Sequence, residues 1–450
     1  MRFEGFEHLL SHYAKLTPDS PALRYENREL SFSGLYDAVK KRAAELRETG
    51  KTCMGILSDG SLDCVIEIFA ANLAGMQVVM LDGSLETGML TMLIRYTDID
   101  TLWGDIDLVE ELEGVLTGGV ADGKWKILFF TSGSTARSKA VVLTDHSLCQ
   151  SAWNGSEKLP LSPEDTLLCI LPLGHVFGFV CGLLWGLACG ACVALGRGAR
   201  HYLDDCSHYR PTAVSVVPLL MGFLLKQRCI NPELKLILVG AGDCPPALIQ
   251  AAAAAGLRVS FGYGLTETSS GVAISVSGDP FAMEVCPDDT ITIAEDGEIL
   301  IEAPTCMMQG YYKWPQYTEE VLRHGILSTG DLGYFDETGR LHITGRKKDI
   351  LVMGDGTKIF LPEYEAGLME CLGNPELAVA LRNDRPVLVY VDREGIAEIG
   401  EIWQKLRPMM VQLPRGQQLT DLIITGDLLP RTASGKIKRW ELQQKVGVTT

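Results

Sequence analysis

Through the first part of the chain, short apolar runs alternate with longer segments in which apolar positions recur at helical spacing. The run at residues 53–57 is followed by an amphipathic segment at 62–74 and a second apolar run at 77–81. Short apolar runs with helical segments between them are typical of parallel strands joined by helices. The pattern therefore predicts a parallel α/β layout. The same rhythm predicts strands at 212–217, 236–239 and 258–261, and residues 7–49 predict two helices around an extended piece at 22–32.

The pattern changes after about residue 285. Short alternating strands are then separated by Asp-Gly and Thr-Gly turns, which predicts an antiparallel β region with strands at 290–293, 298–302 and 340–344. A polar break at residues 345–349 predicts a boundary, so two domains are expected at 1–346 and 347–450. The second domain is predicted to be a small α+β unit with strands at 377–381, 387–391 and 421–424 and helices at 362–372 and 398–410.

One uncharged segment, residues 176–196, admits two interpretations. Glycine recurs there at every fourth position, as in a transmembrane helix with a small-residue packing face. The alternative is a buried helix that lies close to a sheet and runs into a strand at 191–195. The buried helix is favoured, because the segment is single, has no flanking Trp/Tyr belts, and is diluted by Gly and Cys. No stable membrane insertion is therefore expected.

Composition narrows the class of protein. A chain of 450 residues is too long for one core. A formal charge of −17 argues against nucleic-acid partners and anionic membranes, since both need a cationic surface. Thirteen cysteines, an odd number, do not suggest a disulfide framework, and the pair Cys189 and Cys192 is interpreted as core packing. With no apolar signal region at the N-terminus, a reducing cytoplasm fits best.

The most informative segment for function follows the apolar run at 127–130. It reads Thr-Ser-Gly-Ser-Thr-Ala-Arg-Ser-Lys from residue 131 to residue 139. A strand that delivers small hydroxyl residues, a glycine and cations can fold backbone N–H groups around a polyphosphate. No Gly-Lys-Ser/Thr follows at Walker spacing. The segment suggests binding of a nucleoside triphosphate, with an ordinary surface turn as the alternative.

Four further motifs agree with this loop. The segment 261–267 ends a strand with Tyr263, whose ring can stack on a nucleobase, and Glu267, whose carboxylate can hold Mg²⁺. Asp331 presents a carboxylate suited to the two ribose hydroxyls, and Arg346 supplies a permanent cation. Lys436 follows a Ser-Gly turn near the end of the chain. Each has an ordinary structural alternative: a core residue for Tyr263, a helix-start charge for Glu267, a turn former for Asp331, a linker charge for Arg346 and a surface lysine for Lys436.

The order and spelling of the five motifs resemble the AMP-forming adenylate enzymes, which include acyl- and aryl-CoA ligases, peptide-synthetase adenylation domains and firefly-type luciferases. The resemblance covers nearly the whole chain, including residues 71–82, 172–178, 310–315 and 345–349. It implies an α/β fold with a large N-terminal domain of stacked α/β sheets, a β-barrel-like subdomain, and a small mobile α+β C-terminal domain.

The resemblance also implies roles for individual residues. The Ser/Thr-rich loop would close over the β- and γ-phosphates, Thr266 would contact the α-phosphate, and Lys348 falls at the family's hinge. Lys436 matches the adenylation lysine, and His175 lies where CoA ligases carry a histidine beside the acyl site. The expected catalytic residues are Lys436, Glu267, Thr266 and His175, and the expected metal ligands are Thr135 and Glu267. The expected nucleotide-binding residues are Thr131, Ser132, Gly133, Ser134, Thr135, Lys139, Gly240, Ala241, Gly242, Tyr263, Gly264, Asp331, Arg346 and Lys348.

The implied reaction has two steps and three cofactors: ATP, Mg²⁺ and coenzyme A, or the phosphopantetheine of a carrier protein in its place. A substrate carboxylate attacks the α-phosphate of ATP, and a thiol then takes the acyl group. The loop departs from the family's glycine-rich form at Ala136, Ser138 and Ala140. Because alanine restricts positive φ, the loop is expected to be stiffer or differently curved.

The expected substrate is an apolar small-molecule carboxylic acid. Peptide-synthetase domains use an aspartate near the His175 region to hold an amino group, and no acidic residue occurs here between Asp165 and Asp204. Burying an unpaired ammonium would be costly. Apolar residues after His175 could line the acyl pocket or simply be helix core: Phe177, Phe179, Val180, Leu183, Leu184 and Trp185. Three hypotheses stay open: an acyl-CoA synthetase, an acyl–carrier-protein ligase, and a nucleotide-binding homologue with impaired catalysis.

Overall fold

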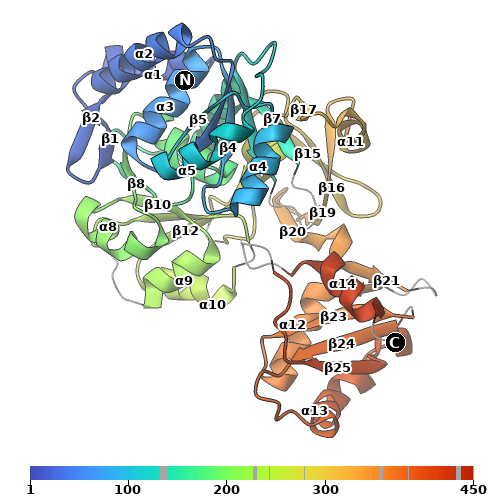
Figure 1. Cartoon of the computed structure of the whole chain (residues 1–450). Coiled ribbons are helices and arrows are strands. Elements are labelled where there is room, and N and C mark those ends of the chain that lie inside the picture. The colour runs from blue at the N-terminus through green and yellow to red at the C-terminus, as the bar shows by residue number, and fades with distance from the viewer. Residues whose placement is uncertain are drawn as a thin grey trace.

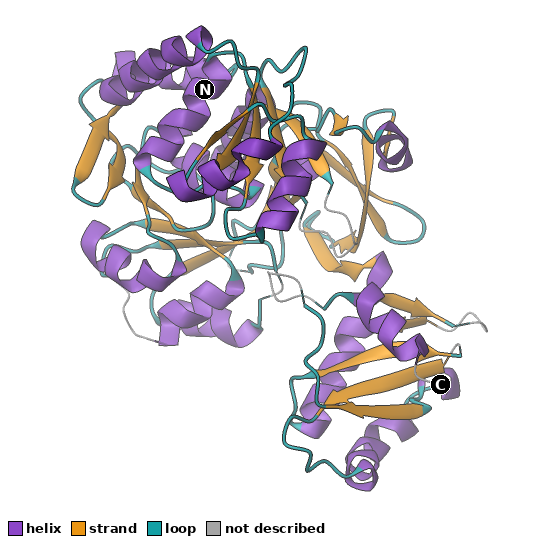
Figure 2. Cartoon of the chain, in the orientation of Figure 1, coloured by secondary structure: helices purple, strands orange, loops and turns teal. Residues whose placement is uncertain are grey.

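The computed structural model describes residues 1–131, 139–226, 231–242, 244–277, 279–353, 358–383, 385–431 and 437–448. Figure 1 shows a large unit, coloured blue to yellow, and a smaller unit in orange and red that contains the C-terminus. In both units helices pack against strands, and some strands reach the edge of the molecule (Figure 2). The predicted fold class, a large α/β domain followed by a small α+β domain, is confirmed.

The larger sheet of the described residues has nine strands, in the order β14-β13-β12-β11-β10-β8-β9-β1-β2. Its central strands are parallel, and antiparallel strands lie at both edges. Every residue of β9, β10 and β11 is buried, as expected for parallel strands covered on both faces. The bounds are β1 (Pro21–Tyr25), β2 (Arg28–Ser31), β8 (Thr166–Cys169), β9 (Cys192–Leu195), β10 (Ala213–Val216), β11 (Leu236–Val239), β12 (Arg258–Leu265), β13 (Ser270–Ile274) and β14 (Glu284–Val285).

A second sheet of the described residues has six strands, in the order β17-β7-β6-β4-β3-β5. The strands β3, β4, β5 and β6 are parallel, whereas β7 returns antiparallel to β6 and β17 is antiparallel to β7. This pairing brings β17, from late in the chain, against a sheet built from early segments. The bounds are β3 (Cys53–Leu57), β4 (Gln77–Leu81), β5 (Thr101–Trp103), β6 (Lys126–Phe130), β7 (Ala140–Thr144) and β17 (Gly310–Tyr311).

Helices of the large unit pack against both sheets. One core joins them, in which the Phe6 ring lies 4.9 Å from that of Phe69, and the Phe129 ring lies 5.6 Å from that of Phe179. The bounds of these helices are α1 (Phe6–Leu16), α2 (Phe32–Glu48), α3 (Leu62–Leu73), α4 (Thr87–Tyr96), α5 (Ile106–Leu112), η1 (Glu113–Val115), α6 (Asp145–Lys158), η2 (Gly178–Leu184), α7 (Trp185–Ala188), η3 (Ala199–His201), α8 (Tyr202–Tyr209), α9 (Pro218–Lys226), α10 (Pro246–Ala254) and η4 (Thr266–Thr268).

The uncharged segment after residue 176 is buried, as predicted. It forms a π-helical stretch, η2, followed directly by α7 and then β9. A Cβ on Gly178, Gly182 or Gly186 would lie 2.3 Å from the Pro172 carbonyl oxygen, 2.9 Å from the Cys169 sulfur or 2.6 Å from a Val193 methyl group, respectively. The glycines therefore let this helical segment lie close against the large sheet. None of the described helices combines the length and the apolar character needed to cross a membrane.

An antiparallel sheet follows in the large unit, as the Asp-Gly and Thr-Gly turns predict. Its order is β15-β16-β19-β18, and β20 pairs with β19. In this sheet Asp331 of β19 lies opposite Arg346 of β20. The bounds are β15 (Thr290–Ile293), β16 (Glu298–Glu302), α11 (Pro315–Val321), β18 (Leu322–Arg323), β19 (Ile326–Phe335) and β20 (Leu341–Arg346).

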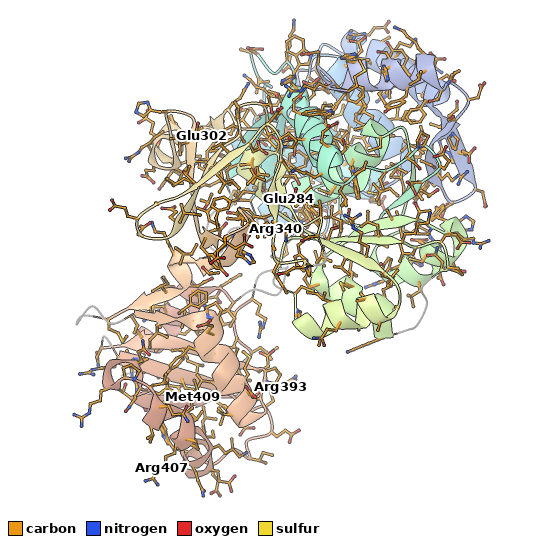
Figure 3. All side chains as sticks on the ribbon, turned by 180° about the vertical axis from the view of Figure 1, so that it is seen from behind. Glu284, Glu302, Arg340, Arg393, Arg407 and Met409 are labelled. Atoms are coloured by element: carbon orange, nitrogen blue, oxygen red, sulfur yellow. The ribbon has the colours of Figure 1, made fainter. Side chains whose placement is uncertain are left out.

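The small unit has a core of its own, which includes Leu368, Leu377, Leu388 and Leu406. Figure 3 shows it from behind, with Arg407 and Met409 labelled on it. The bounds are η5 (Lys347–Asp349), β21 (Ile350–Val352), β22 (Lys358–Phe360), α12 (Leu361–Leu372), β23 (Leu377–Arg382), β24 (Arg385–Val391), α13 (Ile399–Gln412), η6 (Arg415–Gln417), β25 (Asp421–Thr425) and α14 (Arg439–Val448).

The predicted boundary between residues 346 and 347 falls between β20 and η5 and stays a prediction. Just before it, Gly345 has φ of +152°, and a Cβ there would lie 2.1 Å from the Phe360 ring. Only glycine fits this close approach without rearrangement.

Candidate active site

The two ends of the Ser/Thr-rich loop are fixed by the hairpin of β6 and β7. Phe130 pairs with Ala140 across this hairpin. The backbone N–H of Thr131 donates to the carbonyl of Lys139 over 3.0 Å, and the N–H of Lys139 donates to the Thr131 hydroxyl over 3.3 Å. The rest of the loop lies outside the described residues, namely the predicted Ser132, Gly133, Ser134 and Thr135 together with Ala136 and Ser138.

Lys139 lies against two tyrosines that the sequence analysis did not single out. Its Nζ is 4.5 Å from the centre of the Tyr311 ring and 4.9 Å from the centre of the Tyr317 ring. An ammonium over an aromatic face is attracted by the negative potential of the ring. The two rings come from β17 and α11. The only signal in the sequence was the aromatic motif at residues 310–315, and nothing in that motif indicates a contact with Lys139.

Glu267 lies in the one-turn helix η4 that follows β12. The Tyr311 hydroxyl donates to its Oε1 over 2.7 Å. The turn is fixed by Thr268, whose hydroxyl accepts from the Leu265 N–H over 3.0 Å, and by the Met308 N–H, which donates to the Glu267 carbonyl over 2.8 Å. Burial, and then the neighbouring Glu267 carboxylate, raise the pKa of Tyr311, so its hydroxyl stays a proton donor. Glu267 and Lys139 thus contact the same tyrosine.

Asp331 is buried and paired on both oxygens. Its side chain is 4% exposed, Oδ1 lies 2.8 Å from Nε of Arg346, and Oδ2 accepts from the Tyr263 hydroxyl over 2.9 Å. Burial, and then the Asp331 carboxylate, raise the pKa of Tyr263. Tyr263 also packs into the main core, so it combines a core position with a polar contact at the site. The structure therefore brings three predicted residues together.

Two glycines near these side chains allow close packing with neighbouring segments. A Cβ on Gly264 would lie 1.7 Å from the carbonyl oxygen of Ser270, and one on Gly240 would lie 2.8 Å from the Phe177 ring. Gly240, Ala241 and Gly242 directly follow β11, and Ala241 has a φ of +63°. The backbone therefore turns sharply at the ends of β11 and β12, where the predicted nucleotide residues lie.

The remaining predicted residues are placed less fully. Thr266 opens η4, and its carbonyl accepts from the Ser269 N–H over 3.1 Å. His175 is exposed in the turn before η2, where its N–H donates to the Pro172 carbonyl over 3.2 Å. The backbone of Lys348 lies in η5, but its side chain is outside the described part of the chain, and so is Lys436 as a whole.

The donor set fits a magnesium ion that arrives with phosphates. Within the described ranges there is no group of three or more His, Cys, Asp or Glu side chains arranged to hold a metal ion. Mg²⁺ is usually bound by one or two carboxylates and completes its shell with phosphate oxygens and water. Glu267 supplies such a carboxylate, and one of its oxygens accepts a hydrogen bond from Tyr311. The Lys139 ammonium, which lies on the same tyrosine ring, could contact the phosphates.

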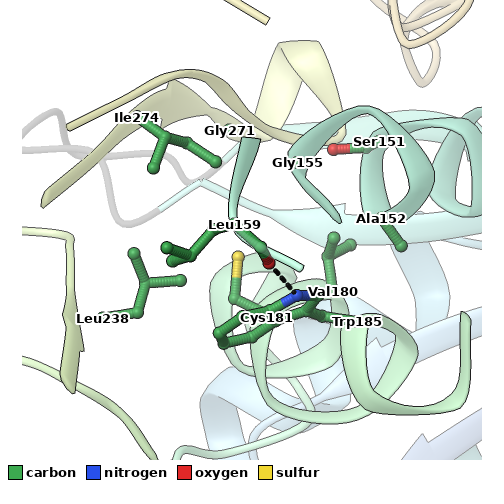
Figure 4. A pocket seen from close by; sticks show the side chains of 10 residues that line it. All are labelled: Ser151, Ala152, Gly155, Leu159, Val180, Cys181, Trp185, Leu238, Gly271 and Ile274. Atoms are coloured by element: carbon green, nitrogen blue, oxygen red, sulfur yellow. Dashed lines mark hydrogen bonds between the residues drawn. The ribbon is translucent and has the colours of Figure 1, made fainter. Parts of the chain in front are cut away.

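A small cavity of about 30 Å³ lies beside the ends of β11 and β13 (Figure 4). Its lining is apolar except for the Ser151 hydroxyl and the Cys181 thiol; the thiol lies 3.4 Å from the Ser270 hydroxyl. Of the apolar residues considered for the acyl pocket, Val180 and Trp185 line the cavity. Three others, Phe179, Leu183 and Leu184, are fully buried core. The lining residues are Ser151, Ala152, Gly155, Leu159, Val180, Cys181, Trp185, Leu238, Gly271 and Ile274.

Comparison with known proteins adds to this geometry. The model of the AMP-binding enzyme family matches residues 123–312, from just before β6 to just after β17. The 2-succinylbenzoate–CoA ligase of Bacillus velezensis is 29% identical, over 96% of this chain and 96% of its own. That of Bacillus licheniformis is 27% identical, over 96% of this chain and 98% of its own.

Solved structures agree with the fold over the whole chain. The o-succinylbenzoate CoA synthetase of Bacillus subtilis, in complex with its acyl-adenylate intermediate, superposes with a TM-score of 0.81 at 25% identity, covering 96% of this chain and 97% of that one. An anthranilate CoA ligase in complex with anthranoyl-AMP shares the fold at a TM-score of 0.82 and 20% identity, covering 99% of this chain and 98% of that one.

Fold, motifs and relatives agree on the class of protein. Residues 123–312 match the AMP-binding enzyme family and the full-length relatives are CoA ligases, so the predicted resemblance to the AMP-forming adenylate enzymes is confirmed. The full-length relatives are CoA ligases, which agrees with the expectation of an acid–thiol ligase of the acyl-CoA synthetase type.

Proposed function

We propose that this protein uses ATP and Mg²⁺ to convert an aryl or other apolar carboxylic acid into an acyl-adenylate and then transfers the acyl group to coenzyme A. The proposal rests chiefly on one observation. Two clusters from distant segments lie at the end of β12: Asp331 with Arg346 and Tyr263, and Glu267 with Tyr311. The full-length relatives of this chain are CoA ligases.

The proposed chemistry proceeds in two steps. A carboxylate oxygen of the acid bonds to the α-phosphorus, and the bond to the departing pyrophosphate breaks. The thiol sulfur then bonds to the acyl carbon, AMP leaves, and the thiol loses its proton. In the first step two anions meet, and unit charges at about 4 Å repel by roughly 4 kcal/mol at an effective dielectric near 20. The ammonium groups of Lys139 and Lys436 are proposed to offset this repulsion.

The predicted residues receive their roles as proposals. Asp331, oriented by Arg346 and Tyr263, would accept hydrogen bonds from the ribose hydroxyls. Glu267 would hold Mg²⁺, which would neutralise phosphate charge. The Ser/Thr-rich loop would surround the β- and γ-phosphates. Thr135 is proposed as a second metal ligand, His175 as an acyl-site residue, and Lys348 as the hinge. The remaining proposed nucleotide contacts are Thr131, Lys139, Gly240, Ala241, Gly242, Gly264 and Thr266.

The cavity supports an apolar or aryl acid over an amino acid. No charged side chain lines it among the described residues, so an ammonium would have no partner there. At about 30 Å³ it is smaller than the roughly 150 Å³ that holds a benzene ring, so in this state it fits a substituent on a ring. We propose benzoates with uncharged substituents as the first acids to test. 2-Succinylbenzoate, the substrate that names the relatives, is the comparison, because none of the described lining residues could pair with its second carboxylate.

ATP–pyrophosphate exchange tests the first step. The panel contains 2-succinylbenzoate, benzoate, anthranilate, hexanoate and two amino acids, and we expect exchange with an aryl acid and none with amino acids. Exchange with no acid would contradict the ligase proposal and favour an impaired homologue. Coenzyme A and an acyl carrier protein are then offered as acceptors. The comparisons give the carrier protein no support, so we expect the thioester on coenzyme A.

A graded series at the cavity tests where the acyl group binds. A Cβ at Gly155 would meet Ile274 at an ordinary 3.4 Å, so Gly155→Ala should be tolerated. Gly155→Leu would fill the cavity and should lower kcat/KM for ring-substituted acids about tenfold more than for benzoate. If kcat/KM fell equally for ring-substituted acids and for benzoate, the acyl group would not bind in this cavity.

Lys436 provides a test of the two-domain mechanism. We expect Lys436→Ala to remove most adenylation but to leave thioester formation from ready-made acyl-adenylate largely intact, because the small domain is proposed to move between the two steps. Single-turnover assays of the separate half-reactions measure this. An equal loss in both steps would contradict the domain movement.

A cytoplasmic location stays a prediction. The described cysteines carry free thiols, most of them buried, which is consistent with a reducing compartment. Cell fractionation followed by detection of the protein with an antibody would decide the location.

A further inference from the structure

The segment from residue 308 to residue 317 connects two parts of the site that are far apart in sequence. The Met308 N–H donates to the carbonyl of Glu267 over 2.8 Å. A few residues on, the Tyr312 N–H donates to the carbonyl of Ala140 over 2.8 Å, directly after Lys139. The segment is therefore attached at one point to the turn that carries the acidic residue and at another to the strand that carries the lysine.

Tyr311 lies in the middle of this segment, and its orientation is fixed. Its side chain is 8% exposed, and its N–H donates to the Thr318 hydroxyl over 2.9 Å. The Tyr311 hydroxyl reaches Oε1 of Glu267 at 2.7 Å, while the face of the same ring lies under the Lys139 ammonium at 4.5 Å. One side chain thus contacts both the proposed metal carboxylate and the proposed phosphate cation.

The two contacts act differently. A short hydrogen bond from a protonated hydroxyl fixes the rotation of a carboxylate and leaves its second oxygen available. A ring face attracts an ammonium without a directional bond, so the lysine keeps its three N–H donors for phosphate oxygens. Tyr317 of α11 supplies a second face at 4.9 Å.

We infer that Tyr311 is a positioning residue that aligns Glu267 for magnesium and, together with Tyr317, places Lys139 for the phosphates. This inference rests on the proposed function, because it assigns a support to residues that bind Mg²⁺ and ATP only if that proposal holds. The Tyr311 hydroxyl orients the carboxylate that is proposed to bind the metal, and the two tyrosine rings hold the Lys139 ammonium in place.

The test measures binding of a non-hydrolysable ATP analogue by calorimetry, once with excess Mg²⁺ and once with a chelator. Tyr311→Phe keeps the ring and removes the hydroxyl. Its matched control is Tyr312→Phe, which removes the same atom from the next residue, where the hydroxyl bonds Asp98 at 2.8 Å. Tyr317→Leu removes the second ring and leaves the hydrogen bond to Glu267 in place.

The variants should separate the two contacts. Loss of a hydrogen bond to a charged group predicts that Tyr311→Phe weakens the gain in affinity from Mg²⁺ about tenfold, with chelated binding unchanged. Tyr317→Leu should weaken binding about two- to fivefold under both conditions. Tyr312→Phe should match the unchanged protein in both.

Three outcomes would overturn the inference. One is that Tyr311→Phe keeps the full magnesium effect, and another is that it weakens binding equally with and without the metal. The third is that Tyr312→Phe loses the magnesium effect to the same degree, since the loss would then reflect general disturbance. If the unchanged protein binds no nucleotide at all, the proposed function itself fails, which separates that failure from the other three.

Discussion

The two ends of the candidate nucleotide site are built in different ways. At one end, Asp331 is buried and paired with Arg346 on one oxygen and Tyr263 on the other. At the other end, Glu267 accepts one hydrogen bond from Tyr311, and Lys139 lies on aromatic faces. The proposed nucleoside end thus has both carboxylate oxygens of Asp331 paired, whereas at the proposed phosphate end Glu267 and Lys139 contact a tyrosine between them and not each other.

The difference fits the charge of the ligand group that each end is proposed to bind. A neutral ribose needs a fixed acceptor, and a buried carboxylate is stable only when it is paired and hydrogen-bonded. A triphosphate brings both negative charge and a metal ion, so a carboxylate and an ammonium locked to each other would have to separate before binding. Substitutions at the Asp331 end should therefore lower the stability of the ligand-free protein. Substitutions at the Glu267 end should instead weaken the proposed binding of Mg²⁺ and ATP.

The largest effect is expected for Glu267→Gln. The amide keeps an acceptor for Tyr311 but removes the charge that the metal requires. We expect pyrophosphate exchange to fall about 100- to 1000-fold, with the free energy of unfolding nearly unchanged. The control is Glu302→Gln, on an exposed position of β16 labelled in Figure 3. If the pyrophosphate exchange rate of Glu267→Gln stayed within threefold of the parent rate, Glu267 would not be a metal ligand.

Gly264→Ala should have the next largest effect, this time on the free protein. The new methyl group would lie 1.7 Å from the Ser270 carbonyl oxygen, so β12 and β13 must separate. We expect a loss of about 2 to 3 kcal/mol in the free energy of urea unfolding. Gly262→Ala is the matched control on the same strand, because its methyl group would be 3.6 Å from Leu238. Similar stability of the two variants would contradict the close approach.

Asp331→Asn separates the two ends of the site directly. It leaves the Arg346 guanidinium without its anion, so we expect about 2 kcal/mol lower stability without ligand and about tenfold weaker AMP binding. Urea unfolding and calorimetry measure the two quantities. Asp336→Asn, whose carboxylate pairs with His342, should leave AMP binding unchanged. If Asp331→Asn weakened binding with no loss of stability, the nucleoside end would not be preassembled.

Asp289 is a reference outside the site, a buried carboxylate that forms no ion pair with a cation among the described residues. Burial, and then Asp288, raise its pKa from 3.8 to about 7, and Asn154 donates to one oxygen over 2.8 Å. The folded state therefore binds the proton more tightly than the unfolded chain. Below pH 4 Asp289 is protonated in both states and its titration costs no stability. The stability falls as pH rises from 3.8 to 7, and the loss stays constant above that.

Asp289→Asn should therefore stabilise the protein at pH 8 and change little at pH 4. The shift corresponds to about 4 kcal/mol at most, and we expect about 1 to 2 kcal/mol because the site can relax on ionisation. Urea unfolding at the two pH values measures this difference. An equal effect at pH 4 and pH 8 would mean that Asp289 does not titrate in this range.

Much of the fold could be predicted from the sequence. The apolar runs at 53–57, 77–81 and 236–239 coincide with β3, β4 and β11 to the residue. Strand pattern is local, and a short apolar run has few alternatives in a buried parallel sheet. The π-helical form of η2 was not predicted, because its glycines indicate close packing and not the helix type.

The sequence predicted which residues belong to the candidate site, but not which of their side chains contact each other. Asp331, Arg346 and Tyr263 were identified separately, and the structure joins them by an ion pair and a hydrogen bond. The contacts of Lys139 with Tyr311 and Tyr317 were missed, because no spacing relates residue 139 to residues 311 and 317. Non-local contacts of this kind are decided by strand order.

By itself, the sequence determined which chemistry is available to this protein, because charge, hydroxyl groups and glycine freedom belong to single residues and short motifs. It also determined the alternation of strands and helices, because periodicity is local. Only the tertiary structure decided that Asp331 is fully paired while Glu267 and Lys139 share a tyrosine. The reason is that β17 pairs with β7 and β20 with β19, and such pairings between distant segments fix which side chains meet.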